Sequence, residues 1–314
     1  MSSPRQATAF APATVANVAV GFDILGFAIG GFGDTVTVRR IDEPTVRIAS
    51  VTGLPEPLPL EAAKNTAGVV LIGLRERLGL EYGFEIEIRK GIPLGSGMGG
   101  SAASAVGALA AANALLDQPL PRTDLFSLSL LGETLAGGAP HGDNVGPCLF
   151  GGLLLARRMD PPDLVQLPVP RQLRAVLVHP DICVSTREAR AILRQDVSMR
   201  GFIDQSANLA AFTAACFTGD YDLLGRSLED LVIEPQRARL IPGFAEAKAA
   251  ALAAGALGFS ISGAGPSVFA LTRGDEMANR VRNAISAVFA GHSLRCEEWA
   301  GSISLKGALV VECN

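Results

Sequence analysis

Cysteine is scarce in this 314-residue chain, and its five copies do not form a pattern. Cys148, Cys183, Cys216, Cys296 and Cys313 are odd in number and widely spaced, and no two make a Cys-x-x-Cys pair. This argues against both a disulfide framework and a cysteine-based zinc site. A reducing compartment fits best, and we expect the protein to be cytoplasmic.

Excess positive charge and long apolar runs are also missing. Twenty-seven basic residues stand against 31 acidic ones, a net charge of −4. The chain therefore has no general cationic field to attract nucleic acid or an anionic bilayer. The most apolar stretches, 101–116 and 245–256, are Ala-rich and shorter than the roughly 20 residues that a bilayer requires. Pro4, Arg5 and Asn17 interrupt the first 20 residues, so we expect neither a signal peptide nor a membrane partner.

The composition that remains is typical of an ordered globular protein. Hydrophobic residues make up 48% of the chain and charged residues 18%. The length exceeds what one hydrophobic core usually supports, which favours two domains. A proline-rich stretch over 160–170 indicates the junction. We therefore expect one domain over 1–160 and a second over 171–314.

The hydrophobic pattern predicts a mixture of strands and helices. Alternating apolar residues over 34–40, 45–49 and 83–89 indicate half-buried antiparallel strands. Further strands are expected over 149–157, 174–179, 257–261, 268–271 and 303–311, and helices over 65–78, 101–116, 122–137, 186–196, 204–218, 222–231, 244–254 and 275–289. This order suits an α+β fold, in which helices cover one face of a sheet.

A glycine-rich loop stands between the predicted strand 83–89 and the predicted helix 101–116. Gly95-x-Gly97-x-x-Gly100 matches the dinucleotide fingerprint. That fingerprint requires an apolar parallel strand ending in an acidic residue about 20 residues on, whereas here the helix runs into the turn 117–121. A P-loop would need lysine at position 101, which is Ser101. Free amides at a helix N-terminus still favour an anion, so a polyphosphate is the natural ligand. A glycine turn without a ligand is the alternative.

Four ordered segments resemble one family, and together they span almost the whole chain. Residues 93–104, Pro-Leu-Gly-Ser-Gly-Met-Gly-Gly-Ser-Ala-Ala-Ser, resemble the phosphate loop of the GHMP kinases, which phosphorylate small metabolites. Residues 11–26, 141–145 and 260–267 narrow the resemblance to the members that phosphorylate homoserine. It implies an N-terminal α+β domain like the second domain of ribosomal protein S5, a ferredoxin-like C-terminal domain, and an active site between them.

The loop departs from that family at one position. GHMP kinases commonly have Gly-Leu-Gly-Ser-Ser-Ala, whereas here Gly99 is followed by Gly100 and only then by Ser101. A glycine amide still serves a phosphate, but Ser101 alone can supply a hydroxyl to a metal.

The resemblance implies ATP and Mg²⁺ as cofactors. The residues expected to bind the nucleotide are Asn65, Pro93, Leu94, Gly95, Ser96, Gly97, Met98, Gly99, Gly100, Ser101, Ala102 and Ala103. Magnesium prefers hard oxygen ligands, and Ser101 and Glu133 match the expected ones. Asn65 is also a plain helix cap, and Glu133 is also compatible with a solvated carboxylate on a helix surface.

The substrate implied is L-homoserine, whose ammonium needs an anion and whose carboxylate needs cations. Asp23 matches the ammonium contact. Arg187 and Arg237 match the carboxylate contacts, a role that suits the guanidinium fork. The remaining residues expected to bind substrate are Asn17, His141, Asn144 and Gly263. Taken singly, an arginine of this kind is more often an ordinary surface residue, and only the motif positions favour the substrate role.

Phosphoryl transfer needs chiefly positioning and charge neutralisation. We expect Ser101, Glu133, Asp143 and Asn144 to take part in catalysis. Asp143 is a candidate proton acceptor, although an aspartate at this place also suits a turn, and Asn144 is expected to position the substrate.

The expected activity is ATP-dependent phosphorylation of the homoserine side-chain hydroxyl to give O-phospho-L-homoserine, on the way to threonine. One alternative is a GHMP kinase that acts on another small alcohol, such as a sugar or mevalonate. The other is a binding protein without catalytic activity on the same fold. A homodimer is among the expected assemblies.

Overall fold

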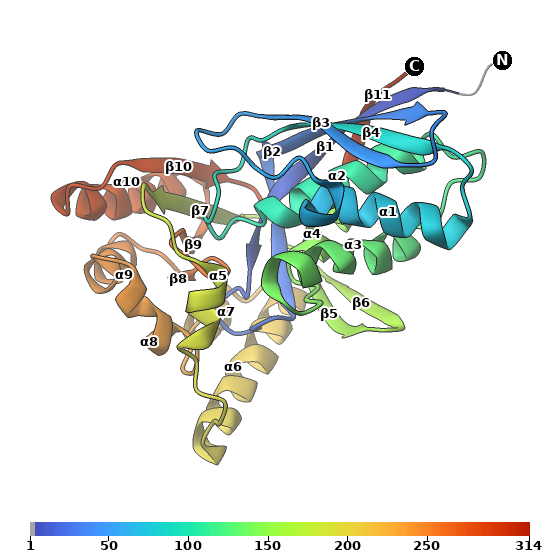
Figure 1. Ribbon diagram of the computed structural model, residues 1–314. Coiled ribbons are helices and arrows are strands. Elements are labelled where there is room, and N and C mark those ends of the chain that lie inside the picture. The colour runs from blue at the N-terminus through green and yellow to red at the C-terminus, as the bar shows by residue number, and fades with distance from the viewer. Residues whose placement is uncertain (1–3) are drawn as a thin grey trace.

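The computed structural model describes residues 4–314 and shows two β-sheets with helices packed against them (Figure 1). The strands are β1 (Gln6–Ala16), β2 (Leu25–Ile41), β3 (Val46–Thr52), β4 (Gly83–Arg89), β5 (Leu153–Met159), β6 (Pro162–Leu167), β7 (Leu173–Pro180), β8 (Gly258–Ile261), β9 (Val268–Arg273), β10 (Cys296–Gly301) and β11 (Leu309–Cys313). The α-helices are α1 (Thr66–Leu78), α2 (Gly100–Asn113), α3 (Arg122–Gly137), α4 (Val145–Phe150), α5 (Thr186–Ala191), α6 (Met199–Thr218), α7 (Tyr221–Ser227), α8 (Glu234–Arg237), α9 (Phe244–Ala253) and α10 (Asp275–Gly291). Two short 3-10 helices are η1 (Ala62–Lys64) and η2 (Ala238–Leu240).

The first sheet has seven strands, and β2 is central to it. The order is β11-β1-β2-β4-β3, and the hairpin β5–β6 pairs with the start of β2. Helix α2 packs against β1 and β2, and α1 and α3 cover it. Because α2 consists almost entirely of Ala, Gly, Ser and Val, other backbones approach it closely, and most of its residues are buried. The helix that follows the glycine loop thus lies at the centre of the first domain.

The second sheet has the order β10-β7-β9-β8, with every neighbouring pair antiparallel. Helices α9 and α10 pack against it. Helix α10 buries Ala278, Val281, Ile285 and Phe289, whose spacing of three or four residues places them on one face. This strand order is that of a ferredoxin-like domain, so the predicted α+β fold with a ferredoxin-like second domain is confirmed.

Contacts between the sheets fix the place of the loops that lie between them. Phe27 on β2 meets Phe269 on β9 edge to face, with ring centroids 6.0 Å apart. The indole nitrogen of Trp299 on β10 donates to the carbonyl of Gly30 at 3.1 Å. The last strand, β11, returns to the first sheet and pairs with β1. Residues 171–314 are therefore not confined to the second sheet.

Several predicted strands differ from the observed ones. β3 and β4 pair in parallel, not antiparallel, because α1 connects them and supplies the crossover that a parallel pair needs. The strand predicted over 149–157 begins only at Leu153, since α4 occupies the residues before it. Part of the predicted junction 160–170 is β6, which pairs with β5. The strand expected over 303–311 is β11, which spans 309–313.

Besides β6, two strands were not predicted from the sequence. β1 is rich in Ala and buried over its second half, so it lacks the alternation of large apolar and polar residues by which half-buried strands are recognised. β10 contains Glu297, Glu298 and Trp299 and is largely exposed or half-buried. Its residues pair with β7, a contact distant in sequence that no local pattern indicates.

Candidate active site

The glycine-rich loop predicted from the sequence connects β4 to α2; residues 93–101 are called the phosphate loop below. Gly95, Gly97 and Gly99 have φ angles of 60°, 76° and 70°, values that side chains strongly disfavour. A Cβ on Gly97 would lie 2.4 Å from the carbonyl oxygen of Ser262, and one on Gly99 would lie 2.0 Å from Oγ1 of Thr14. Glycine is thus required both by the backbone angles and by close neighbours.

Both sheets hold the phosphate loop in place. The amide of Thr14 on β1 donates to the carbonyl of Met98 at 3.1 Å. From the second domain, the Ser262 hydroxyl donates to the Gly97 carbonyl at 2.7 Å, and the Ser267 amide donates to the Ser96 carbonyl at 3.2 Å. The loop therefore lies at the junction of the two domains, where the sequence predicted the active site.

A cavity of about 260 Å³ opens beside the phosphate loop. Of the residues expected to bind a nucleotide, those that line it are Asn65, Pro93, Leu94, Gly95, Ser96, Gly97, Gly99, Gly100, Ser101 and Ala102. Met98 is buried, and it and Ala103 are not part of the cavity wall. Lys64, Thr66, Glu133, Asn144 and Gly263 contribute other parts of the wall.

The electrostatics of this cavity favour an anion. Helix α2 begins after Gly99, and no side chain accepts from its first amides, so their partial positive charge is available to a ligand. The Ser96 hydroxyl is buried and has no hydrogen-bond partner among residues 4–314. Buried polar groups normally have a partner. A phosphate in the cavity would supply one.

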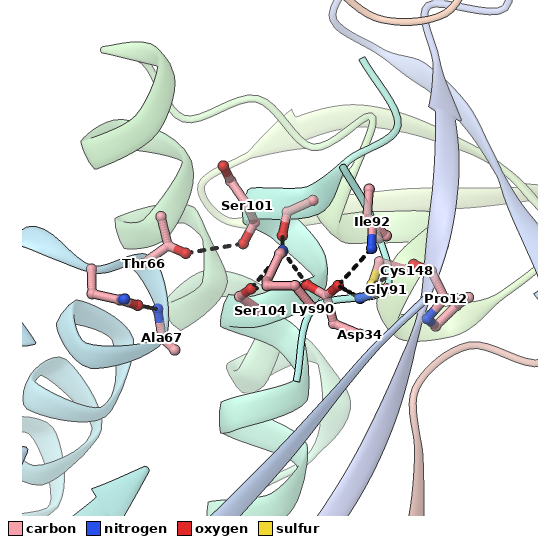
Figure 2. Close-up of polar contacts among 12 residues, drawn as sticks. Pro12, Asp34, Thr66, Ala67, Lys90, Gly91, Ile92, Ser101, Ser104 and Cys148 are labelled. Carbon is pink, nitrogen blue, oxygen red and sulfur yellow. Dashed lines mark hydrogen bonds and ion pairs between the residues drawn. The ribbon is translucent and has the colours of Figure 1, made fainter. Parts of the chain in front are cut away.

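A buried ion pair beneath the loop was not predicted from the sequence. Figure 2 shows Lys90 between the start of α2 and Asp34. The Lys90 ammonium donates to the Asp34 carboxylate, to the Gly100 carbonyl at 2.8 Å and to the Ser104 hydroxyl at 3.0 Å. These three acceptors use all three of its N–H groups. Lys90 therefore fixes the first turn of α2.

Asp34 extends the same network to the start of the phosphate loop. One carboxylate oxygen accepts from the amides of Gly91 and Ile92 at 3.0 and 3.2 Å (Figure 2). Its other oxygen accepts from the Ser104 hydroxyl at 2.9 Å. The sequence offered one signal: a lysine placed directly between a strand and a glycine loop.

Asn65 caps a helix, as the sequence indicated, and also lines the cavity. Its Oδ1 accepts from the Ala67 amide at 3.1 Å and caps α1, while its Nδ2 donates to the Pro59 carbonyl at 3.0 Å. The same residue lines the cavity, and Thr66 beside it donates to the Ser101 carbonyl at 3.2 Å. The cap thus connects α1 to the N-terminus of α2.

Two carboxyl groups near the cavity, those of Glu133 and Asp143, have raised pKa values. Burial, with the nearby Asp143 charge, raises the pKa of Glu133 to about 8. Burial, with the charge of Asp23, raises the pKa of Asp143 to about 7. Glu133 lines the cavity together with Ser101. A cation or hydrogen-bond donor brought by a ligand would lower the cost of their negative charge.

Asp23 forms the centre of a charged cluster, defined here as Asp23, His141, Arg190 and Arg237. Arg190 binds the Asp23 carboxylate in bidentate fashion, with N–O distances of 3.0 and 2.9 Å. His141 Nδ1 lies 3.5 Å from the same carboxylate. Arg237 is buried beside Phe22, its guanidinium 5.1 Å from the ring centroid. Burial and the charge of Arg190 lower the pKa of Arg237 to about 10, so it stays charged at neutral pH.

Asn17 and Gly263 connect this cluster to the phosphate loop. Asn17 accepts from the Asp23 amide at 3.0 Å and donates to the Gly263 carbonyl at 2.9 Å. Arg237 donates to the same carbonyl at 3.0 Å. Asn17, Val18 and Ala19 all have positive φ angles, of 70°, 44° and 57°. Such conformations cost free energy and concentrate at functional sites.

Two buried nitrogens in the charged cluster have no partner. His141 Nε2 and Arg190 Nε make no hydrogen bond within residues 4–314. Burial is the main reason that the pKa of His141 is lowered, although the Asp23 charge opposes the shift, so the ring is neutral at pH 7. The cluster thus offers unpaired polar groups beside a matched pair of opposite charges.

The structure does not bring Arg187 to this cluster. Arg187 is exposed on α5, whereas Arg190, three residues later on the same helix, holds Asp23. Sequence reasoning missed Arg190, although the segment Ser-Thr-Arg-Glu-Ala-Arg contains both arginines. The other predicted substrate residues, Asn17, Asp23, His141, Arg237 and Gly263, do come together.

Asn144 lies on the side of the site that faces the nucleotide cavity. Its Oδ1 accepts from the Thr14 hydroxyl at 2.7 Å, and the residue lines the cavity. Asp143 is instead buried and is not part of the cavity wall. The neighbouring side chains therefore have different surroundings.

Comparisons with known proteins agree with this geometry. Residues 65–152 match the model for the GHMP kinases N terminal domain, and residues 210–291 match the model for GHMP kinases C terminal. The chain belongs to the GHMP kinase family. This GHMP kinase is 53% identical over 304 residues to a homoserine kinase from Xanthomonas campestris, covering 97% of this chain and 94% of the relative.

Other relatives of this GHMP kinase carry the same name. A homoserine kinase from Xylella fastidiosa is 50% identical, with 97% of this chain and 94% of the relative covered. The crystal structure of homoserine kinase from Cytophaga hutchinsonii superposes with a TM-score of 0.95 at 44% identity, with 99% of each chain covered. The similarity includes both domains and the junction that contains the phosphate loop.

Proposed function

We propose that this protein transfers the γ-phosphoryl group of ATP to the side-chain hydroxyl of L-homoserine, giving O-phospho-L-homoserine. The observation that carries the proposal is the carboxylate of Asp23 paired with Arg190 and close to Arg237, at the far side of the phosphate loop. An α-amino acid presents an ammonium and a carboxylate side by side. Such a zwitterion matches neighbouring groups of opposite charge.

For the amino-acid substrate, we assign the ammonium to Asp23 and the carboxylate to Arg190 and Arg237. His141 Nε2 and Arg190 Nε, which are buried without partners in the described chain, would then acquire them. Asn17 and the Gly263 carbonyl hold Asp23 and Arg237 in register through the hydrogen bonds described above. Arg187, which was predicted from the sequence to bind the carboxylate, is exposed, and we do not assign it a direct contact with the substrate.

For the nucleotide, we assign the phosphates to the phosphate loop and the first turn of α2. The glycine amides, the α2 N-terminus and the Ser96 hydroxyl provide donors for phosphate oxygens. Leu58, Pro59, Pro93 and Leu94 form an apolar part of the cavity that suits the flat base of a purine nucleotide.

Magnesium fits the donors that the cavity offers. The Ser101 hydroxyl and the Glu133 carboxylate both line it, and burial raises the pKa of Glu133, so a cation there would favour its ionised form. Residues 4–314 contain no cluster of three His, Cys, Asp or Glu side chains that could hold a metal, so phosphate oxygens and water would complete the shell. When bound, the metal neutralises phosphate charge.

We assign the positioning of the acceptor hydroxyl to Asn144 and keep Asp143 as the candidate proton acceptor. Asn144 faces the cavity and is oriented by Thr14. Asp143 is buried and does not line the cavity. In a loose transition state the hydroxyl proton leaves late, and positioning then contributes more than a base does.

Two other functions are less well supported. A GHMP kinase for a neutral alcohol would have no use for the paired charges of Asp23 and Arg190. A binding protein without activity would have no need of Ser101 and Glu133 on the wall of the phosphate cavity. We further place the reaction on the way to threonine, and in the cytoplasm, where free thiols like those of the five cysteines persist.

A coupled assay of ADP release tests the proposal directly. The panel consists of homoserine, mevalonate, galactose and threonine, each with MgATP. We expect homoserine to give the highest kcat/KM, and Asp23→Asn to reduce it selectively. A comparable rate with mevalonate or galactose would favour the neutral-alcohol kinase. No ADP release with any acceptor, from protein that binds ATP, would favour the binding protein.

A further inference from the structure

A second cavity, of about 790 Å³, lies beside the start of the phosphate loop. Pro93 and Leu94 line both this cavity and the nucleotide cavity, so the two share a wall. The rest of the second cavity is formed by the segment after β3 and by residues near the ends of β7 and β10. The proposed phosphoryl transfer gives this cavity no ligand, although it borders the loop that we assign to the phosphates.

Cys183, between β7 and α5, lines the second cavity and touches the phosphate loop. Its thiol is exposed. A Cβ on Gly95 would lie 2.4 Å from Cys183 Sγ, so the sulfur occupies the space that a side chain on Gly95 would take. Any group bonded to this sulfur therefore lies directly against the phosphate loop.

His179 on β7 connects the second cavity to the same loop. Its Nδ1 lies 3.1 Å from the Ser267 hydroxyl, and the Ser267 amide donates to the Ser96 carbonyl. His179 is only 7% exposed and lines the cavity, yet its Nε2 makes no hydrogen bond within residues 4–314. Burial lowers the pKa of His179, so the ring is neutral at pH 7. With Nδ1 donating to Ser267, Nε2 is an acceptor for an N–H group of a ligand.

Acidic side chains dominate the charge of the second cavity. Glu56, Asp181 and Glu297 line it together with a single arginine, Arg295. Arg295 donates to the Asp181 carboxylate at 2.8 Å, which leaves the two glutamates without a cation in the cavity wall. A ligand with ammonium groups is therefore favoured over an anionic one. The same ammonium groups would supply the N–H donor that His179 lacks.

The other cysteines are less suited to react with such a ligand. Burial raises the pKa of Cys148 well above its usual range, that of Cys216 to about 12 and that of Cys296 to about 11. Because the thiolate is the reactive form, these three thiols are inert at neutral pH. Cys313 is exposed, but it lies on β11 in the first sheet and does not line the second cavity.

We propose that Cys183 forms a reversible mixed disulfide with small disulfides that carry ammonium groups, and that the attached group prevents a nucleotide from binding at the phosphate loop. The Cys183 thiolate attacks one sulfur of the small disulfide, and the new S–S bond holds that half in the second cavity. The other half leaves as a thiolate and takes up the proton that Cys183 lost. Excess thiol reverses the exchange. The inference rests on the assignment of the nucleotide made above.

Mass spectrometry of peptides from protein treated with cystamine, the disulfide of cysteamine, tests the modification. We expect an adduct on Cys183 that dithiothreitol removes, and none in Cys183→Ser. The exposed Cys313 in the same sample is the internal reference for a thiol outside the cavity. Cys313→Ser is the matched control variant and should be modified at Cys183 like the wild type.

Two further disulfides of similar size test the role of charge. These are the uncharged disulfide of mercaptoethanol and the anionic disulfide of mercaptopropionate. Relative to Cys313, Cys183 should react about tenfold faster with cystamine than with the anionic reagent at low ionic strength. The difference should shrink in about 1 M salt, where the screening length is about 3 Å.

Calorimetry with ATP measures the effect on the phosphate loop. Protein modified at Cys183 should bind ATP about 5- to 150-fold more weakly, the usual strength of coupling between two sites. By reciprocity, ATP should reduce the equilibrium extent of modification at Cys183 in a mixture of cystamine and cysteamine, and leave that at Cys313 unchanged. Cys183→Ser should bind ATP like the reduced wild type. Cys183→Met, which carries a permanently larger side chain, should bind it weakly without any disulfide.

Three results would overturn the proposal. If Cys313 reacts while Cys183 in the folded protein does not, the second cavity does not admit the disulfide. If modified protein binds ATP as tightly as reduced protein, the attached group does not reach the phosphate loop. Equal preference for the three reagents would remove the requirement for ammonium groups. None of these readouts depends on homoserine turnover, so a failure of the substrate assignment would be seen separately in the ADP-release assay.

Discussion

The phosphate loop and the charged cluster are connected through Asn17 and Gly263 but would recognise their ligands through different atoms. The loop presents backbone amides, and three glycines with positive φ angles permit its close contacts. The charged cluster presents side chains, and Asp23 and Arg190 come from segments 167 residues apart. The phosphate loop depends on glycines whose lack of a side chain permits close contacts. The charged cluster depends on the fold, which brings its distant residues together. The two regions should therefore respond differently to substitution.

The largest effect should come from Gly97→Val. A side chain there would collide with the Ser262 carbonyl and force an unfavourable φ angle, displacing the loop from its place between the domains. Displacements of about 1 Å near a reacting centre cost on the order of 100-fold in rate, and we expect ATP binding to fall below detection by calorimetry. Gly291→Val, where space is open, is the control. Normal ATP affinity in folded Gly97→Val would remove the loop from the nucleotide site.

The charged cluster should affect the amino acid and not the nucleotide. Removing one member of a buried charge pair costs about 2–5 kcal/mol. Because the Asp23–Arg190 pair is only part-buried, Arg190→Leu should lie at the low end of that range and lower kcat/KM for homoserine by roughly 30-fold, with little change in ATP affinity. Arg187→Leu is the matched control, because it removes an exposed arginine from the same helix. Steady-state kinetics with each substrate varied measure both. A larger loss in Arg187→Leu would restore the assignment made from the sequence alone.

Asn144 and Asp143 should differ by a smaller factor. Asn144 faces the cavity, so Asn144→Ala should impair kcat/KM for homoserine more than Asp143→Asn does. If Asp143 were an essential base, its amide variant would lose about 10²–10⁴-fold in kcat. Such a loss, with an acidic-limb pKa that disappears in the variant, would reverse the order.

The smallest effect concerns stability and pH. The pKa of Glu133 is raised to about 8 in the folded protein, so between its unfolded pKa near 4.5 and 8 the folded state binds more protons. Stability must therefore fall as pH rises through this window. Without ligands, Glu133→Gln should stabilise the protein at pH 8.5, above the folded-state pKa, and have little effect at pH 4.5. Urea unfolding at both values measures this difference, and equal effects at the two would show that Glu133 is not held neutral.

The sequence predicted the loop better than the cluster for physical reasons. A backbone site leaves its record in adjacent residues, so Gly95 to Ser101 could be recognised together. Arg187 and Arg190 lie within one turn of α5, and only the placement of that helix determines which of them reaches Asp23. The Lys90–Asp34 pair depends on the contact between β2 and the start of α2, which no local pattern reveals.

The fold shows the same division. α1 and α3 have the predicted ends, because Asn65, Gly79 and Gly138 mark them by local capping chemistry. The parallel pairing of β3 with β4 and the return of β11 to β1 depend on tertiary contacts. Local chemistry thus identified the helices, while strand partners required the assembled chain.

The return of β11 has a consequence for how the protein is made. Residues 309–313 of β11 pair with residues 7–10 of β1. During translation, β11 is therefore synthesised long after β1, the strand it pairs with. At about 5–20 residues per second, roughly 15–60 s separate the synthesis of the two strands. Throughout that time the outer edge of β1 is open to pairing with other chains. Chaperones that shield nascent polypeptides should therefore raise the yield of active protein. The increase should be smaller for a circularly permuted variant in which β11 is synthesised directly before β1.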